Sequence, residues 1–459
     1  MGRIFGTDGA RGVANTEISC ELAMNIGRAV AMAMAEDIGR KPVVLIGKDT
    51  RISSNMLESA MAAGLCSVGA DVIIAGVLPT PAVAYLVAKG HADAGIMLSA
   101  SHNSYEYNGI KIFGEGGLKL TDAKEFEIES IVLDDKPYTL RQGWEVGRVT
   151  RLENLACEYI RCLVNTIEGD LEGLCVAVDC SNGSATETAI SLFEKLGANA
   201  EILNGEPNGI NINKNCGSTH IGVLSAYVKE NGFDVGIAFD GDADRCLAVD
   251  ENGDILSGDV IMAIIALDRK SRGLLAHNTI VATVMSNLGL SRFGEENGID
   301  IAKTKVGDRY VLEHMLNHGM NFGGEESGHV IMSDYMSTGD GQLTAIHLLD
   351  VLARSGKKLS ELAKVMKVYP QVLKNFRADT AMKSILQTDK GAQQIIAKAQ
   401  AKLGADGRIL VRPSGTEPII RVMIEGTDES MIEDLATEVT GQLEERLTQN
   451  EEYKRLGGF

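Results

Sequence analysis

Asp234–Arg245 reads DVGIAFDGDADR, an unbroken apolar run that ends in a loop with three aspartates. An apolar run of this length predicts a strand covered on both faces, as in a parallel sheet. A related stretch, DAGIMLSASHN, begins at Asp93, and Ser101 there takes the place of Asp242. The similarity has two interpretations, because Asp-Xxx-Gly is also common turn chemistry. The first interpretation predicts two similar units, each with a loop at a strand's carboxyl end, where open α/β sheets bind ligands.

The rest of the chain repeats this alternation of short apolar runs and helical patterns. Examples of the runs are PVVLIGKD at 42–49 and TIVATVMSN at 279–287, and SATETAISLFEKLG at 184–197 has a helical pattern. The alternation predicts an α/β protein with mixed, mostly parallel sheets. After residue 368 the strands and helices stop alternating, which predicts a smaller C-terminal α+β domain with an antiparallel sheet.

A chain of 459 residues is too long for one ordinary core and indicates about three or four domains. Breaks in the pattern predict where they meet. We expect domain I at 1–150 with the Ser101 loop, domain II at 151–252 with the aspartate loop, domain III at 253–367 with GGEESGH, and domain IV at 368–459 with RPSGTEP.

Composition narrows the choice of partners and compartment. The formal net charge of -19 disfavours nucleic acid and anionic membranes as partners. Eight cysteines without a CxxC motif are typical of reduced thiols in the cytoplasm. The N-terminal segment MGRIFGTDGARG lacks the apolar core of a signal peptide. We therefore expect a cytoplasmic protein that binds neither nucleic acid nor a membrane.

The aspartate loop carries the strongest single signal for chemistry. Asp240, Asp242 and Asp244 would repel one another unless a hard divalent cation bound their oxygens. Glu251 completes the spacing of an EF-hand calcium loop, but Arg245 stands where that loop needs glycine and the preceding run predicts a strand. A few carboxylates that share the ion with a substrate phosphate favour Mg²⁺.

The Ser101 loop, SASHN, is by itself typical of a polar turn. Ser101 and His102 do not form a dyad merely by being neighbours, because adjacent side chains in an extended loop diverge. Beside the aspartate loop, a phosphorylated Ser101 would supply an oxygen to the cation, which would neutralise charge as the phosphoryl group moves. Lys111, a few residues further on, is a candidate for proton transfer.

Two further loops complete the candidate site. The segment RPSGTEP and its surroundings combine arginines, hydroxyl groups and a glycine whose backbone amide can approach an anion closely, which predicts a phosphate cradle. A hairpin turn between two strands is compatible with this prediction. The residues of this cradle are Arg412, Ser414, Gly415, Thr416 and Arg421. In the Gly-rich loop GGEESGH, Glu325 and Ser327 are candidates for hydrogen bonds to sugar hydroxyls. The sequence contains no GxxxxGK[ST], GxGxxG or HExxH motif, which disfavours kinases and zinc proteases.

Taken in order, these loops resemble the α-D-phosphohexomutase superfamily, essentially from end to end. The resemblance rests on FGTDGARG (5–12), SASHNSYEYNGIK (99–111), NGININKNCGSTH (208–220), FDGDADR (239–245), TKVGDRYV (304–311), GGEESGH (323–329) and RPSGTEPIIRV (412–422). The first segment together with CGSTH and KVGDRYV is most similar to the bacterial branch that acts on glucosamine phosphates.

The resemblance implies three similar α/β/α domains, a smaller fourth domain and an isomerase that moves a phosphate between the 6 and 1 positions of glucosamine. A hexose bisphosphate would be intermediate and activator, and the protein would be a homodimer. Phospho-Ser101 would give and regain the phosphoryl group and would ligate one Mg²⁺ together with Asp240, Asp242 and Asp244. The groups around the transferred phosphoryl would be Arg11, Lys111, His102 and Arg245. Glu325 and Ser327 would grip the sugar, and the cradle residues named above would hold the phosphate that does not react.

The chain departs from the family pattern at three positions. Ala10 and Ser104 stand where Ile and Pro are usual, and Glu326 replaces the Gln common in the glucosamine branch. The last change keeps glucose and mannose phosphates open as alternative substrates. From other classes, a non-catalytic sugar-phosphate sensor and a calcium-binding structural protein remain as alternatives.

Overall fold

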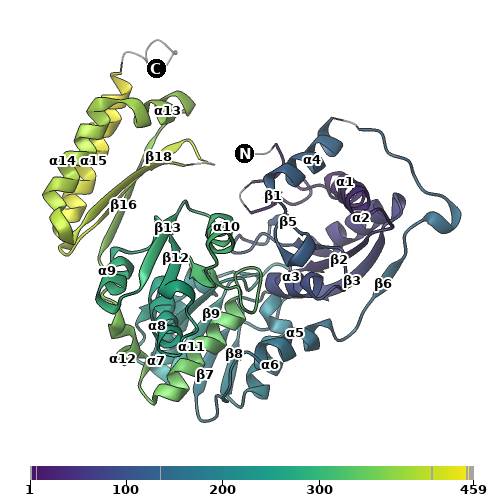
Figure 1. Cartoon of the computed structure of the whole chain (residues 1–459), viewed down its shortest axis with the longest axis horizontal. Helices are drawn as coiled ribbons and strands as arrows, with labels where there is room; N and C mark the ends of the chain where they lie inside the picture. Colours follow the sequence, from purple (N-terminus) through teal and green to yellow (C-terminus); the bar gives the residue numbers. More distant parts are fainter. Residues whose placement is uncertain (1–2, 7, 135, 415–416, 451–452, 454–459) are drawn as a thin grey trace. The chain divides into compact units, whose positions relative to one another are not determined.

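The computed structural model describes residues 3–6, 8–134, 136–414, 417–450 and 453, and Figure 1 traces it along the sequence. Contacts divide the chain into two compact units. The first consists of residues 1–286 and 294–365, and the second of residues 287–293 and 366–459. The first unit contains three sheets and the second contains one, within the described residues.

The first sheet has a parallel centre and an antiparallel edge. Its strands, in spatial order, are β1 (Ala10–Val13), β5 (Tyr107–Phe113), β4 (Ala94–Leu98), β2 (Val43–Lys48), β3 (Asp71–Val77) and β6 (Val149–Arg151). Its helices are α1 (Cys20–Ile38), α2 (Ser54–Ser67), α3 (Thr80–Ala88) and α4 (Asp122–Leu133). Every residue of β4 is buried, as its unbroken apolar run predicts. The exposed edge strand β6, which pairs with β3, was not predicted, because its three residues lie in a stretch without periodicity.

The second sheet repeats this plan. Its strands, in spatial order, are β11 (Ile255–Leu256), β10 (Cys246–Asp250), β9 (Val235–Phe239), β7 (Cys175–Asp179) and β8 (Asn199–Leu203). Helices α5 (Leu155–Val164), α6 (Ala189–Lys195) and α7 (Gly222–Asn231) belong to this region. Strands β9, β7 and β8 are parallel to one another, and β10 runs antiparallel to β9.

The third sheet is smaller. Its strands, in spatial order, are β13 (Asp300–Thr304), β12 (Thr279–Thr283), β14 (Phe322–Gly324) and β15 (Val330–Met332). The helices of this region are α8 (Gly258–Ser271), α9 (Leu288–Asn297), α10 (Asp308–His318), α11 (Gly341–Ser355) and α12 (Leu359–Leu362). Residues 288–293 of α9 belong to the second unit. Strands β13, β12 and β14 are parallel, and β15 is antiparallel to β14.

The second unit has the antiparallel sheet predicted for the C-terminal region. Its strands, in spatial order, are β16 (Gln371–Arg377), β18 (Ile419–Glu425) and β17 (Arg408–Pro413). Its helices are α13 (Thr380–Thr388), α14 (Lys390–Leu403) and α15 (Glu429–Thr448). Apolar side chains of the sheet and helices form one buried core. The predicted fold class is thereby confirmed in both units.

One local arrangement recurs in all three sheets of the first unit. A buried strand of the parallel set (β4, β9 or β14) ends in a polar loop, and the chain then returns as an antiparallel neighbour (β5, β10 or β15). The two related stretches of sequence are the first two copies, so their similarity reflects architecture and not only turn chemistry. No helix in the described part of the chain is both long and apolar enough to cross a membrane.

Candidate active site

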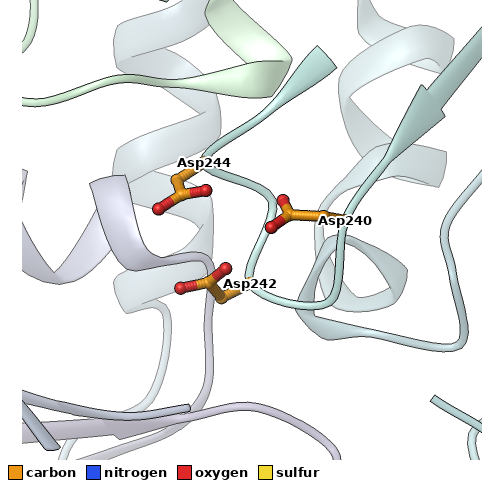
Figure 2. A group of neighbouring side chains, drawn as sticks. All are labelled: Asp240, Asp242 and Asp244. Atoms are coloured by element: carbon orange, nitrogen blue, oxygen red, sulfur yellow. The ribbon is translucent and has the colours of Figure 1, made fainter. Parts of the chain in front are cut away.

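The loop between β9 and β10 gathers three buried carboxylates. One oxygen atom of each of Asp240, Asp242 and Asp244 lies within 4.8 Å of the others, and Figure 2 shows the side chains converging. Burial, and then the charges of Asp244 and Asp242, raise the pKa of Asp240 well above its usual range. Among the described residues, Oδ1 of Asp242 and Oδ1 of Asp244 have no hydrogen-bond partner. Crowded, desolvated carboxylate oxygens without donors fit a hard divalent cation.

The loop between β4 and β5 places Ser101 against this cluster. The residue is 1% exposed, and its Oγ donates a hydrogen bond to Oδ2 of Asp240 over 2.6 Å. Its φ of 51° lies in the left-handed region, which a non-glycine residue adopts at a cost of about 1–3 kcal/mol. His102 Nδ1 lies 3.3 Å from the same Oγ. Burial, followed by the charges of Arg245 and Arg11, lowers the pKa of His102 to about 4, so its ring is neutral near pH 7.

Lys111 on β5 reaches the cluster from the first sheet. Its Nζ lies 2.9 Å from Oδ2 of Asp242 and 3.1 Å from Oδ2 of Asp244. A third carboxylate, that of Asp8, lies 3.2 Å away. Burial alone would lower the pKa of Lys111, but Asp242 and Asp244 outweigh it and raise this pKa well above its usual value. The side chain is therefore positively charged at neutral pH.

Several residues of this network were not predicted as functional. Asp8 lies between Lys111 and Lys119, and Lys119 pairs with Asp308 at the start of α10. His329 faces Asp308 at 3.5 Å and Asp244 at 3.7 Å. Asp8, Asp308 and His329 belong to the segments FGTDGARG, TKVGDRYV and GGEESGH, so a signal was present in the sequence without a role attached.

Thr80 carried no sequence signal at all. It begins α3, and its Oγ1 donates to Oδ2 of Asp242 over 2.6 Å while its backbone N donates to the carbonyl oxygen of Asp242 over 2.9 Å. These bonds join the first two sheets at the aspartate loop.

Two arginines at the cluster have unused donors. Arg11 on β1 pairs with Asp8, and the backbone N of Arg245 donates to Oδ1 of Asp240 over 3.2 Å. Nε of each arginine is buried without a hydrogen-bond partner in the described part of the structure. Burial by itself would lower the pKa of Arg245, but the charges of Asp240 and Asp244 outweigh it, so this pKa is raised above its usual value. The buried Nε donors of these two arginines fit an anionic phosphoryl group.

The loop between β14 and β15 carries the predicted sugar-binding residues. Oε1 of Glu325 accepts a hydrogen bond from the backbone N of Gly307 over 3.0 Å. Oγ of Ser327 is buried and has no hydrogen-bond partner among the described residues. An unpaired buried hydroxyl fits a ligand hydroxyl, because a hydrogen bond there would remove the cost of desolvation.

In the second unit, Arg412 and Arg421 lie directly opposite each other on β17 and β18. Burial, and then the charge of Arg421, lowers the pKa of Arg412. Like charges at paired positions destabilise a sheet, and an anion between them would remove this repulsion. Ser414 is 5% exposed at the end of the same hairpin. The remaining two predicted cradle residues, Gly415 and Thr416, lie outside the described residues.

Comparison with known proteins agrees with this geometry. Four domain profiles of phosphoglucomutase/phosphomannomutase match the chain: the α/β/α domains I, II and III at residues 2–139, 157–253 and 257–369, and the C-terminal domain at residues 352–442. The chain belongs to this family, whose members are phosphohexomutases.

Its relatives narrow the comparison further. Phosphoglucosamine mutase of Acetivibrio thermocellus is 53% identical, over 97% of this chain and 100% of the relative. Phosphoglucosamine mutase of Caldicellulosiruptor bescii is 51% identical, over 98% of this chain and 100% of the relative. A solved phosphoglucomutase/phosphomannomutase family protein from Burkholderia thailandensis superimposes with a TM-score of 0.81 at 26% identity, over 97% of this chain and 98% of that one.

Proposed function

We propose that this protein interconverts glucosamine 6-phosphate and glucosamine 1-phosphate as a phosphoglucosamine mutase. The observation that carries the proposal is the 2.6 Å hydrogen bond from Ser101 Oγ to Asp240 within the three-aspartate cluster. This bond supports the proposed roles of Ser101 as the nucleophile and of the three aspartates as cation ligands. The names of full-length relatives at about 50% identity support the choice of sugar.

In the proposed reaction, phospho-Ser101 gives its phosphoryl group to the free hydroxyl of the sugar phosphate. The bond from phosphorus to Oγ breaks, a bond to the sugar oxygen forms, the hydroxyl loses its proton and Oγ regains one. We assign the proton transfer to Lys111, whose Nζ lies 2.9 Å from Asp242 in the aspartate cluster, and His102, whose Nδ1 lies 3.3 Å from Oγ, is the second candidate. The sugar bisphosphate then turns end for end, and the reverse transfer returns a phosphoryl group to Ser101.

The proposed cofactor is one Mg²⁺ per site. Asp240, Asp242 and Asp244 would hold it together with an oxygen of phospho-Ser101. When bound, it would stabilise the negative charge that builds up on the phosphoryl oxygens during transfer.

The remaining residues are proposed to recognise the substrate. Glu325 and Ser327 would bind sugar hydroxyls, and the cradle of Arg412, Ser414, Gly415, Thr416 and Arg421 would bind the phosphate that is not transferred. We further propose a cytoplasmic homodimer, and eight cysteines without disulfide bonds support the compartment. The domain boundaries at 150, 252 and 367 stay a prediction.

The proposal is tested by turnover of the purified protein with Mg²⁺ and a trace of hexose bisphosphate. We expect a clearly higher kcat/KM for glucosamine 6-phosphate than for glucose or mannose phosphates. Preference for glucose or mannose phosphate would keep the proposed chemistry and change the assigned substrate. Glu326, which replaces the Gln common in the glucosamine branch, is the departure that leaves this outcome open. No turnover on any of them, with tight binding and no phosphate on Ser101, would favour the sugar-phosphate sensor.

Arg421→Gln should raise KM for glucosamine 6-phosphate, because one charge-assisted hydrogen bond to the non-reacting phosphate is lost. Such a bond contributes about 1.5–3 kcal/mol, which corresponds to a roughly 10–100-fold effect. Steady-state kinetics measure it, and Lys402→Gln, which removes an exposed ion pair to Glu438 in the same unit, is the control. An unchanged KM in the Arg421 variant would exclude this arginine from the phosphate cradle.

A further inference from the structure

The segment after β2, Asp49-Thr50-Arg51, contains a buried ion pair that the proposed chemistry does not use. The side chains of Asp49 and Arg51 are both 0% exposed, and Nε of Arg51 lies 2.7 Å from Oδ2 of Asp49. Oδ1 of Asp49 also accepts from the backbone N of Arg51 over 3.0 Å, which closes an Asx turn. Because the pair is internally neutral, it adds no net charge to the phosphoryl site.

All remaining donors of this guanidinium point to backbone oxygens of the Ser101 loop. Nη2 donates to the carbonyl oxygens of Ser101 and Asn103 over 2.9 and 2.8 Å. Nη1 donates to the carbonyl oxygens of Ser104 and, over 3.0 Å, Tyr107. With the bond to Asp49, the five N–H groups of an arginine are accounted for. One planar group thus spans the loop from the nucleophile to the start of β5.

Two further contacts act on the same backbone. Oγ of Ser99 donates to Oδ2 of Asp49 over 2.6 Å and accepts from the backbone N of Ser101 over 2.9 Å. From the second sheet's region, Nδ2 of Asn213 donates to the carbonyl oxygens of Ser101 and Asn103 over 2.8 and 3.0 Å. The peptide groups on both sides of Ser101 are therefore fixed, which stabilises its left-handed φ of 51°.

We infer that Arg51, with Asp49 and Asn213, is a positioning residue that holds Ser101 in one orientation toward the aspartate cluster whether or not it carries a phosphoryl group. This inference rests on the proposed function. Ser101 alternates between a hydroxyl and a charged phosphate in every cycle, so its side chain alone cannot keep the loop fixed. Within the Ser101 loop, Arg51 and Asn213 bond to backbone oxygens, which are the same in both states, and we call these two side chains the clamp.

The test is Arg51→Lys, which keeps the positive charge beside Asp49 but replaces the planar fork by a single ammonium group. We expect kcat to fall about 100-fold, the effect of misplacing a reacting group by about 1 Å, with KM for glucosamine 6-phosphate changed less than about threefold. Phosphorylation of Ser101 by glucose 1,6-bisphosphate, followed by intact mass, should slow in parallel. Backbone amide exchange in residues 99–108 should become faster.

A matched control separates positioning from stability. Lys48, at the end of β2, is a buried cation bonded to Glu58 at 2.6 Å and Asn55 at 2.7 Å, and these bonds do not reach the Ser101 loop. Lys48→Gln should lower the melting temperature and keep kcat. Asn213→Ala removes the other side chain that bonds to the Ser101 and Asn103 carbonyls, so it should also lower kcat. This variant tests the inference even if Arg51→Lys folds poorly.

The inference is overturned if folded Arg51→Lys and Asn213→Ala keep the wild-type kcat, or if KM rises as much as kcat falls. Failure of the proposed function is distinguishable from this, because amide exchange and the rate of Ser101 phosphorylation report on the clamp without sugar-phosphate turnover. The wild-type enzyme could prove inactive on glucosamine phosphates while both variants show faster amide exchange and slower phosphorylation of Ser101. This result would refute the proposed substrate and support the positioning role of Arg51 and Asn213.

Discussion

Ser101→Ala is expected to lower mutase turnover by on the order of 1,000-fold or more while the protein stays folded, as removal of a covalent nucleophile does elsewhere. The physical reason is that no other described hydroxyl occupies its place against Asp240, where Oγ lies at 2.6 Å. Intact mass after incubation with glucose 1,6-bisphosphate gives a second measurement. The wild type should gain one phosphoryl group and the variant should gain none.

The structural cost of this substitution should be modest. The left-handed φ is strained for serine and alanine alike, so the cost is that of the lost hydrogen bond, about 1–3 kcal/mol of unfolding free energy. Ser104→Ala, at an exposed position three residues further on in the same loop, removes a hydroxyl and leaves the carbonyl bonded to Arg51, so it should keep its turnover. A folded Ser101→Ala enzyme with turnover near that of the wild type would mean that another group accepts the phosphoryl.

Local patterns predicted much of this fold. The runs that became β4 and β9 are five apolar residues bounded by polar loops, and their burial on both faces follows from their composition. The sequence also predicted that the three aspartates gather, because carboxylates at alternate positions repel one another unless a cation lies between them, and the structure brings one oxygen of each within 4.8 Å of the others. The sequence also predicted the change to an antiparallel sheet after residue 368, which β16, β18 and β17 confirm.

These local patterns did not predict contacts between segments that lie far apart in the sequence. Thr80 starts a helix whose apolar composition predicts only burial, yet it holds Asp242 from 162 positions away. Arg51 belongs to a turn typical of the end of a strand, and its pattern does not indicate which carbonyls the guanidinium would reach. The strand β6 is three exposed residues long, and its pairing with β3 depends on the sheet edge being available. Such roles are set by the packing of sheets against one another.

Asp242→Asn should lower turnover at least about 100-fold, since losing an outer partner of a metal ligand already costs about 10–100-fold. One oxygen of Asp242 is committed to Thr80 and Lys111, and the other is buried without a hydrogen-bond partner among the described residues. Asparagine keeps the shape and removes the charge, so the loss should appear as weaker Mg²⁺ binding. Removing Mg²⁺ from the wild type with EDTA should abolish turnover, and adding Mg²⁺ back should restore it.

Thermal unfolding provides a measurement that does not depend on activity. A cation at 100 times its Kd stabilises the folded state by about 2.7 kcal/mol, so Mg²⁺ should raise the wild-type Tm and have a much smaller effect on Asp242→Asn. Asp350→Asn is the control, because this buried carboxylate on α11 pairs with Arg354 at 2.9 Å: its Tm should fall while the Mg²⁺-dependent rise persists. A stabilisation by Ca²⁺ that exceeds that by Mg²⁺ and leaves turnover unsupported would favour the structural calcium site. Equal Mg²⁺ stabilisation of the wild type and Asp242→Asn would remove Asp242 from the ligand set, because a carboxylate that binds the ion cannot lose its charge without weakening the complex.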